Sequence, residues 1–108
     1  MSPNIKHKAH YPFPLVQDLV RHGHWISTKT VNMSAVALGF HPQTEIPKAI
    51  LRLTNHHLIK SVEDTRIKGR WQDAYSLSYE GHQLYIKFTV DMASQKVLLV
   101  LSFKENIS

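Results

Sequence analysis

The sequence has 108 residues, of which 43% are hydrophobic and 19% charged, and this composition is typical of one folded domain rather than a disordered chain. Thirteen Lys and Arg against eight Asp and Glu give a formal net charge of +5, which favours a polyanionic partner. The absence of cysteine excludes disulfide frameworks, Cys-ligated zinc, iron–sulfur clusters and thiol catalysis.

The longest apolar run, residues 97–101, is much shorter than the roughly 18 residues that a membrane helix requires. Residues 1–11 carry Lys6, His7 and Lys8 with no apolar stretch behind them, so we expect no secretory signal peptide. These two observations predict a cytoplasmic protein without a membrane partner.

The first half of the sequence is predicted to be helical. Residues 1–12 are expected to form a basic N-terminal arm, followed by a single domain over residues 13–108. Pro14 suits the first turn of a helix and Gly23 suits the position just after its end. Residues 25–28 are expected to be an extended link, and residues 32–38 a second helix. Thr44 is predicted to cap a third helix, with Pro47 inside its first turn.

In the second half the hydrophobic period changes from 3.6 to 2. Strands are predicted over residues 71–79, 83–90 and 96–104, with a Glu80-Gly81 turn between the first two. Strict alternation in the last strand places Leu98 and Val100 on the same face as Lys104. Consecutive antiparallel strands preceded by helices indicate an α+β fold, with the helices packed on one sheet face and the other face open.

Histidine raises the question of a metal site, because His22 and His24 are spaced for one side of an extended segment and His56 and His57 are adjacent. Neither pair has a carboxylate at zinc-ligand spacing, so solvated surface histidine is the favoured interpretation and we expect no metal. The sequence also contains no GxSxG, P-loop or GxGxxG motif, and we expect no cofactor.

The open sheet face holds the candidate chemistry. Tyr85 and Lys87 share one strand face, Lys104 lies opposite Phe103, and Lys60 is expected between the third helix and the sheet. Ammonium groups for phosphate, an aromatic ring for stacking and the Gln72 amide for hydrogen bonds would suit RNA. An ordinary solvated sheet face accounts for the same residues, and both interpretations stay open at this point.

Six segments occur in an order and near-spacing that can be compared with a known family: LVQDLVRHG at 15–23, ALGF at 37–40, KS at 60–61, WQDAY at 71–75, LYIKFTV at 84–90 and SFKE at 102–105. In these segments the sequence resembles the MqsR family of toxins, over residues 15–105. The most specific segments are WQDAY and SFKE. The resemblance implies a RelE-like fold and the toxin role in a bacterial type II toxin–antitoxin pair.

The resemblance also implies an endoribonuclease (an mRNA interferase) that cleaves mRNA at GCN-type sites, GCU preferred, without the ribosome. The positions that match the family's proposed catalytic set are Lys60, Gln72, Tyr85 and Lys104. We add two RNA-binding candidates, Arg70 and Lys87, from their charge and predicted face. The implied protein partner is an MqsA-like antitoxin with zinc-binding and helix-turn-helix domains.

Cleavage is expected to use the RNA's own 2′-hydroxyl, giving a 2′,3′-cyclic phosphate and a 5′-hydroxyl without metal. Lys60 or Lys104 would stabilise the phosphorane, Tyr85 would donate a proton or hydrogen bond, and Gln72 would orient the substrate. The sequence does not assign acid and base among the two lysines and the tyrosine. Two alternatives remain: a non-catalytic nucleic-acid-binding or regulatory module, and an interaction protein neutralised by an acidic partner.

Overall fold

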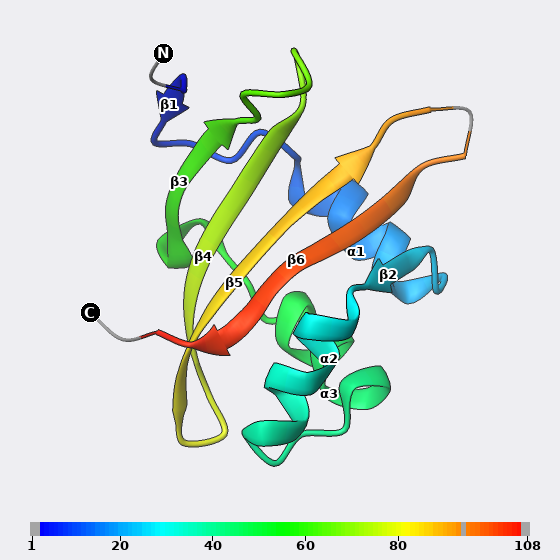
Figure 1. Ribbon diagram of the computed structural model, residues 1–108, viewed down its shortest axis with the longest axis vertical. Helices are drawn as coiled ribbons and strands as arrows, with labels where there is room; N and C mark the ends of the chain where they lie inside the picture. Colours follow the sequence, from blue (N-terminus) through cyan, green and yellow to red (C-terminus); the bar gives the residue numbers. More distant parts are fainter. Residues whose placement is uncertain (1–2, 94, 107–108) are drawn as a thin grey trace.

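The computed structural model describes residues 3–93 and 95–106 (Figure 1). The helices are α1 (Phe13–Arg21), α2 (Lys29–Ala37) and α3 (Pro42–Leu51), with a short 3₁₀ turn at Asn55–His57. The strands are β1 (Ile5–Lys6), β2 (Trp25–Ser27), β3 (Leu58–Glu63), β4 (Trp71–Tyr79), β5 (His82–Asp91) and β6 (Val97–Glu105).

The six strands form one sheet in the order β1-β3-β4-β5-β6-β2. All neighbouring strands are antiparallel except β2, which pairs parallel to β6. In Figure 1, α1 passes behind β6, and side chains of α1 and α3 join the rear face of the sheet in one apolar core. The predicted α+β class is therefore confirmed. No helix in the described ranges is both long and apolar enough to cross a membrane.

The helix boundaries are set by local capping. Pro14 lies in the first turn of α1, and Gly23, with φ +73°, follows its end, as predicted. Helix α2 begins three residues earlier than predicted, because the Thr28 side chain accepts a hydrogen bond from the Val31 N–H at 3.1 Å. The predicted cap of α3 at Thr44 is wrong, since that helix begins at Pro42 and Thr44 lies within its first turn.

The three predicted strands are present as β4, β5 and β6, and the sheet contains three more. The segment predicted as an extended link forms β2, and residues 58–63 form β3, so Lys60 lies inside the sheet rather than before it. Strands of two or three residues, such as β1 and β2, carry too few positions for a period to show. They are defined by the neighbour with which they pair.

A β-bulge corrects the predicted faces of the last strand. The pairing of β5 with β6 shifts by one residue at Leu101. The alternation of side chains is therefore reset there, and residues 97–100 face the side opposite to the one that counting back from Lys104 predicts. Leu98 and Val100 are fully buried in the core together with Phe103. The prediction that they share a face with Lys104 is therefore wrong.

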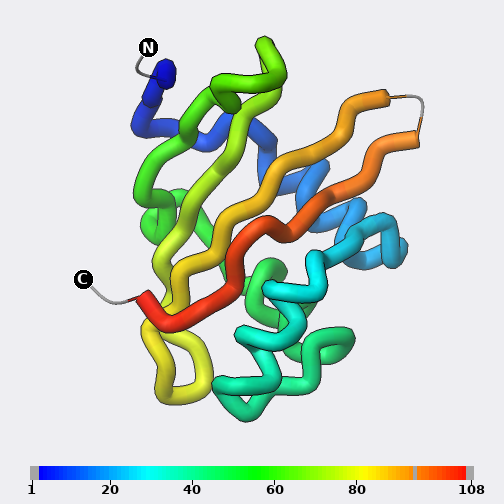
Figure 2. Tube along the Cα trace, in the orientation of Figure 1, coloured from blue at the N-terminus to red at the C-terminus, as the bar shows by residue number. Residues whose placement is uncertain are grey.

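The buried carboxylate of Asp73 in β4 holds the N-terminal segment against the sheet. Its oxygens accept hydrogen bonds from the backbone N–H of His10 at 3.1 Å, the N–H of Tyr11 at 2.9 Å and the Ser61 hydroxyl. Figure 2 shows this segment (blue) crossing behind the sheet before it enters α1. The stretch predicted as an arm is thus packed on the domain from β1 onward.

Tyr11 occupies the point where β4 and β5 separate. The two strands pair from Asp73–Phe88 to the hairpin, and in Figure 1 they diverge beyond that pair. The carbonyl of Trp71, beyond the paired region, accepts hydrogen bonds from the Tyr11 hydroxyl at 2.9 Å and the Thr89 hydroxyl at 2.7 Å. Side-chain hydroxyls therefore replace the missing ladder partner of this carbonyl.

Replacing Asp73 with Asn is expected to lower the free energy of unfolding by about 2–3 kcal/mol, because the new NH₂ group would face backbone donors in a site without water access. Urea denaturation measures the change. The control is Asp18→Asn, which removes an exposed carboxylate paired with His22 and should cost less than about 1 kcal/mol. Equal effects of the two substitutions would contradict the anchoring role.

Candidate active site

The sheet face opposite the helices carries five of the predicted site residues. We call it the basic face and define it by Lys60, Gln72, Tyr85, Lys87 and Lys104. Each of them lies next to a buried residue that points to the core side of its strand, and side chains alternate along a strand, so these five point to the other face. The pairing between strands gives the same result. A register shift at Ile59 brings Lys60 onto the same face as Lys87.

Tyr85 and Lys104 are directly opposite each other on β5 and β6. The ammonium nitrogen of Lys104 lies 5.7 Å from the centre of the Tyr85 ring, within the range of a cation–π contact. A cavity of about 410 Å³ opens beside this pair, and the rest of it is lined by Lys87, Ser102, Asn106 and the carboxylate-bearing Glu105. A lysine, a phenol and a second lysine thus converge on one solvent-accessible hollow.

Lys60 and Lys87 flank Ala74 in the next row of the face. Two strand spacings separate them, about 10 Å between backbones, whereas Lys60 and Lys104 are three spacings apart, about 14 Å. Lys104 therefore lies with Tyr85, and Lys60 lies beside Lys87 on the other side of β4.

Gln72 occupies the row beyond Lys60 and is its diagonal neighbour across β3 and β4. The amide nitrogen donates a hydrogen bond to the Asp64 carboxylate at 3.3 Å. This contact orients the side chain. The amide oxygen of Gln72 accepts no hydrogen bond from any described residue. Gln72 can thus accept a hydrogen bond from a ligand on the basic face.

The electrostatics of Tyr85 select one role for its hydroxyl. Tyr85 is half-buried between β4 and β6, and this burial raises its pKa above the ordinary value of 10. The hydroxyl therefore stays protonated at neutral pH. In this form it can donate a proton or a hydrogen bond.

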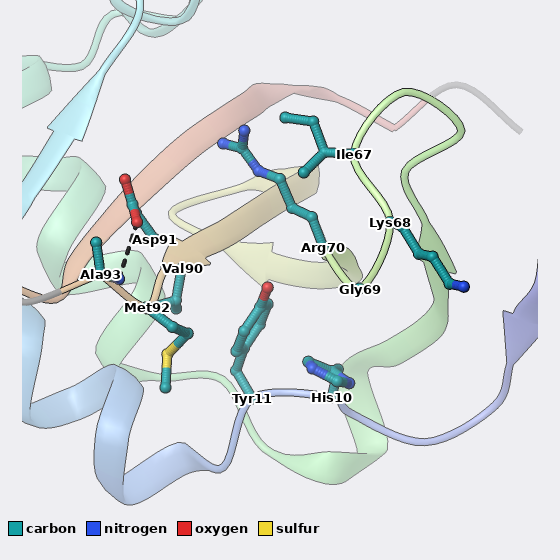
Figure 3. A pocket seen from close by; sticks show the side chains of 10 residues that line it. All are labelled: His10, Tyr11, Ile67, Lys68, Gly69, Arg70, Val90, Asp91, Met92 and Ala93. Atoms are coloured by element: carbon teal, nitrogen blue, oxygen red, sulfur yellow. Dashed lines mark hydrogen bonds between the residues drawn. The ribbon is translucent and has the colours of Figure 1, made fainter.

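Arg70, one of the two added candidates, does not join this cluster. It lies at the end of the β3–β4 connection and lines a separate cavity with His10 and Tyr11 (Figure 3). Lys87, the other addition, lies next to Tyr85 on β5 and lines the same hollow. Charge and predicted face suggested both residues, and their positions in the fold show that their surroundings differ.

The hollow also contains polar residues that were not predicted. Ser102 and Asn106 line it, and the amide nitrogen of Asn106 donates to the Ser76 hydroxyl at 2.9 Å. Ser102 could have been predicted from the sequence, because it lies two residues before Lys104 on β6 and therefore shares its face. Asn106 follows the end of β6 and gave no such signal.

One histidine side chain of each pair is hydrogen-bonded within the fold. His22 Nδ1 lies 2.8 Å from the Asp18 carbonyl oxygen, and His57 Nδ1 accepts the N–H of Thr54 at 2.9 Å. Across residues 3–93 and 95–106, no group of three or more His, Asp or Glu side chains is arranged to hold a metal ion.

A family model matches most of the chain. The model of the family described as "Motility quorum-sensing regulator, toxin of MqsA" matches residues 8–105, and no curated protein matches the sequence. The matched range contains every residue of the basic face and begins upstream of the resemblance noted above, so it includes His10 and Tyr11, which Asp73 holds. The chain therefore belongs to the MqsR family, the toxins that are paired with the antitoxin MqsA.

Proposed function

We propose that this toxin is a ribosome-independent endoribonuclease that cleaves mRNA at GCN-type sites, GCU preferred, on the basic face. The observation that carries the proposal is the direct pairing of Tyr85 with Lys104 beside Lys87, around one open hollow, in a chain of a toxin family. A protonated phenol and two ammonium groups are the groups that a phosphodiester reaction can use without a cofactor.

The proposed reaction is transesterification within the RNA. The 2′-oxygen forms a bond to the adjacent phosphorus, the bond from phosphorus to the 5′-oxygen breaks, and the 2′ proton leaves to water. Lys104 stabilises the negative charge on the phosphoryl oxygens, and Tyr85 donates its proton to the departing 5′-oxygen and regains one from solvent. The products carry a 2′,3′-cyclic phosphate and a 5′-hydroxyl.

The other residues of the basic face are assigned to substrate binding. Lys60 is about 14 Å from Lys104 across the sheet, so it is placed to contact a neighbouring phosphate rather than the one being cleaved. Lys87 lies between the two and can hold the strand in register. Gln72 offers its amide oxygen to an amino group of a base.

The antitoxin partner is proposed to be MqsA-like, with zinc-binding and helix-turn-helix domains, and the pair is proposed to act in the cytoplasm. The family match supports an MqsA partner, since its description makes the toxin one "of MqsA". Co-purification of the toxin with the product of the adjacent gene tests the pairing.

Incubation of the purified protein with a GCU-bearing RNA and EDTA is expected to give cleavage at that site, because the proposed chemistry uses only protein and RNA groups. End analysis should find a 5′-hydroxyl on the downstream fragment. The matched control RNA has the GCU replaced by an unrelated triplet and should remain intact. Loss of cutting in EDTA, or a downstream 5′-phosphate, would contradict the scheme, and retention of uncut RNA would favour a non-catalytic binding module.

Tyr85→Phe is expected to reduce the cleavage rate at least about 100-fold, the scale of a lost general acid, since only the hydroxyl is removed. Affinity for an RNA with 2′-deoxyribose at the cleaved position should change less than threefold, which separates catalysis from binding. The control is Lys29→Ala, which removes an exposed cation on α2 and should leave the rate unchanged. An unchanged rate in Tyr85→Phe would remove the phenol from the mechanism.

The raised pKa of Tyr85 predicts a particular pH dependence. A general acid works only while protonated, so the rate ratio of wild type to Tyr85→Phe should stay constant up to about pH 9 and fall only above pH 10. Single-turnover rates over this range give the ratio, and the ultraviolet titration difference between the two proteins gives the ionisation of Tyr85 directly. A midpoint below the ordinary value of 10 would contradict the raised pKa.

A further inference from the structure

A second cavity lies at the end of the sheet where β4 and β5 separate. It encloses about 430 Å³, and we call it the fork cavity (Figure 3). Three segments distant in sequence line it: residues 10–11 of the N-terminal segment, 67–70 of the β3–β4 connection and 90–93 at the end of β5. It shares no lining residue with the hollow beside Tyr85.

The fork cavity lies at the end of the basic face. Arg70 precedes Gln72 by two residues and so alternates onto that face, whereas His10 and Tyr11 belong to the segment that crosses behind the sheet. The cavity is lined by residues of both and opens where β4 and β5 diverge. From Tyr85 to Val90 the strand advances about 17 Å. A single RNA strand lying along β5 from the Tyr85–Lys104 pair would therefore reach the cavity several nucleotides away.

The charge of the cavity suits an anion. Arg70 is half-buried, and its guanidinium makes no hydrogen bond or ion pair with any residue in the ranges 3–93 and 95–106. Lys68 is a second cation in the lining. The one carboxylate there, Asp91, accepts a hydrogen bond from the Ala93 N–H at 3.0 Å. A guanidinium without a protein partner offers a planar pair of donors that matches a phosphate.

The wall opposite the Arg70 guanidinium in Figure 3 is formed by the rings of His10 and Tyr11. His10 is stacked on Trp71, with ring centres 5.3 Å apart and an interplanar angle of 17°. Lys6 Nζ lies 2.8 Å from His10 Nδ1, so Nδ1 accepts from the ammonium and Nε2 carries the proton. Burial, followed by the charge of Lys6, lowers the pKa of His10, which keeps the ring neutral. The wall thus presents a flat, uncharged ring with one remaining donor.

We propose that the fork cavity is a second RNA subsite, which binds one nucleotide of the substrate with its base against His10 and its phosphate on Arg70. The proposal rests on the proposed ribonuclease function and extends it, since it makes affinity depend on nucleotides well outside the cleaved triplet. An aromatic platform beside a cation is how sequence-tolerant single-strand sites hold RNA. The hollow at Tyr85 selects the bond that is cleaved, and the fork cavity binds a further nucleotide of the same strand.

The test uses the full-length protein and three RNAs with 2′-deoxyribose at the cleaved position, which removes the attacking hydroxyl. One RNA covers the GCU with a single flanking nucleotide on each side, and the other two extend it by six nucleotides at either the 5′ or the 3′ end. Wild-type protein is expected to bind one extended RNA about tenfold more tightly than the short one. The end that gives this gain identifies the strand's direction across the sheet.

Arg70→Gln is expected to lose that tenfold gain while binding the short RNA as wild type does. The slope of log affinity against log salt for the extended RNA should become shallower by about 0.7, the value for one phosphate contact on a single strand. The matched control is Arg66→Gln, an exposed arginine of the same connection that pairs with Asp64, and it should retain the gain. Because the Arg70 side chain makes no hydrogen bond in the described fold, thermal unfolding of Arg70→Gln should match wild type.

Several outcomes would overturn the subsite. The first is that neither extension increases the affinity for RNA. The second is that Arg70→Gln lowers the affinity for short and extended RNA equally. The third is that Arg66→Gln lowers the affinity for extended RNA as much as Arg70→Gln does, which would indicate a diffuse electrostatic effect. Parallel incubation of wild type with the unmodified RNAs tests the proposed function separately. Cleavage without an extension effect removes the fork cavity alone, whereas absence of cleavage removes the ribonuclease and the subsite with it.

Discussion

The buried carboxylate of Asp73 is the contact on which the arrangement of this protein depends. It gathers two backbone N–H groups of the N-terminal segment and the hydroxyl of Ser61 from β3 at one point behind β4. Strand alternation gives the adjacent Gln72 to the opposite face. Two adjacent residues of β4 therefore have separate roles: Asp73 fixes the N-terminal segment on one side of the sheet, and Gln72 supplies a polar group to the basic face on the other.

Two register shifts decide which lysines meet on the basic face. The bulge at Leu101 lets β6 bury Val100 and Phe103 while Lys104 still faces solvent opposite Tyr85. A shift at Ile59 does the same for Lys60 in β3. Apolar anchors and lysines therefore coexist on β3 and on β6 without burying either lysine in the core. The charge of +5 is partly concentrated on this face by backbone geometry rather than by a run of basic residues.

The sequence predicted the elements whose signals are local and left out those that depend on a partner strand. Pro14, Gly23 and the period of β5 identify their elements from neighbouring residues alone. Strand β2 forms by pairing with β6, and its three residues carry no periodic pattern of their own. In β6, the alternation of side chains on one side of the bulge does not predict which face the residues on the other side point to. The same limit applies to the site: alternation paired Tyr85 with Lys104, but the strand order was required to separate Lys60 from Lys104 and Arg70 from both.

A small side chain between two lysines of the basic face has a consequence for their spacing. Ala74 lies between Lys60 and Lys87 and is 1% exposed, although it faces away from the helices. Its backbone pairs with Lys60 on one side and Lys87 on the other, so the shortest side chain of the row lies between two of the longest. A larger side chain at this fully packed position would have to displace one of the two lysines, so the spacing of two positive charges depends on a residue that carries none.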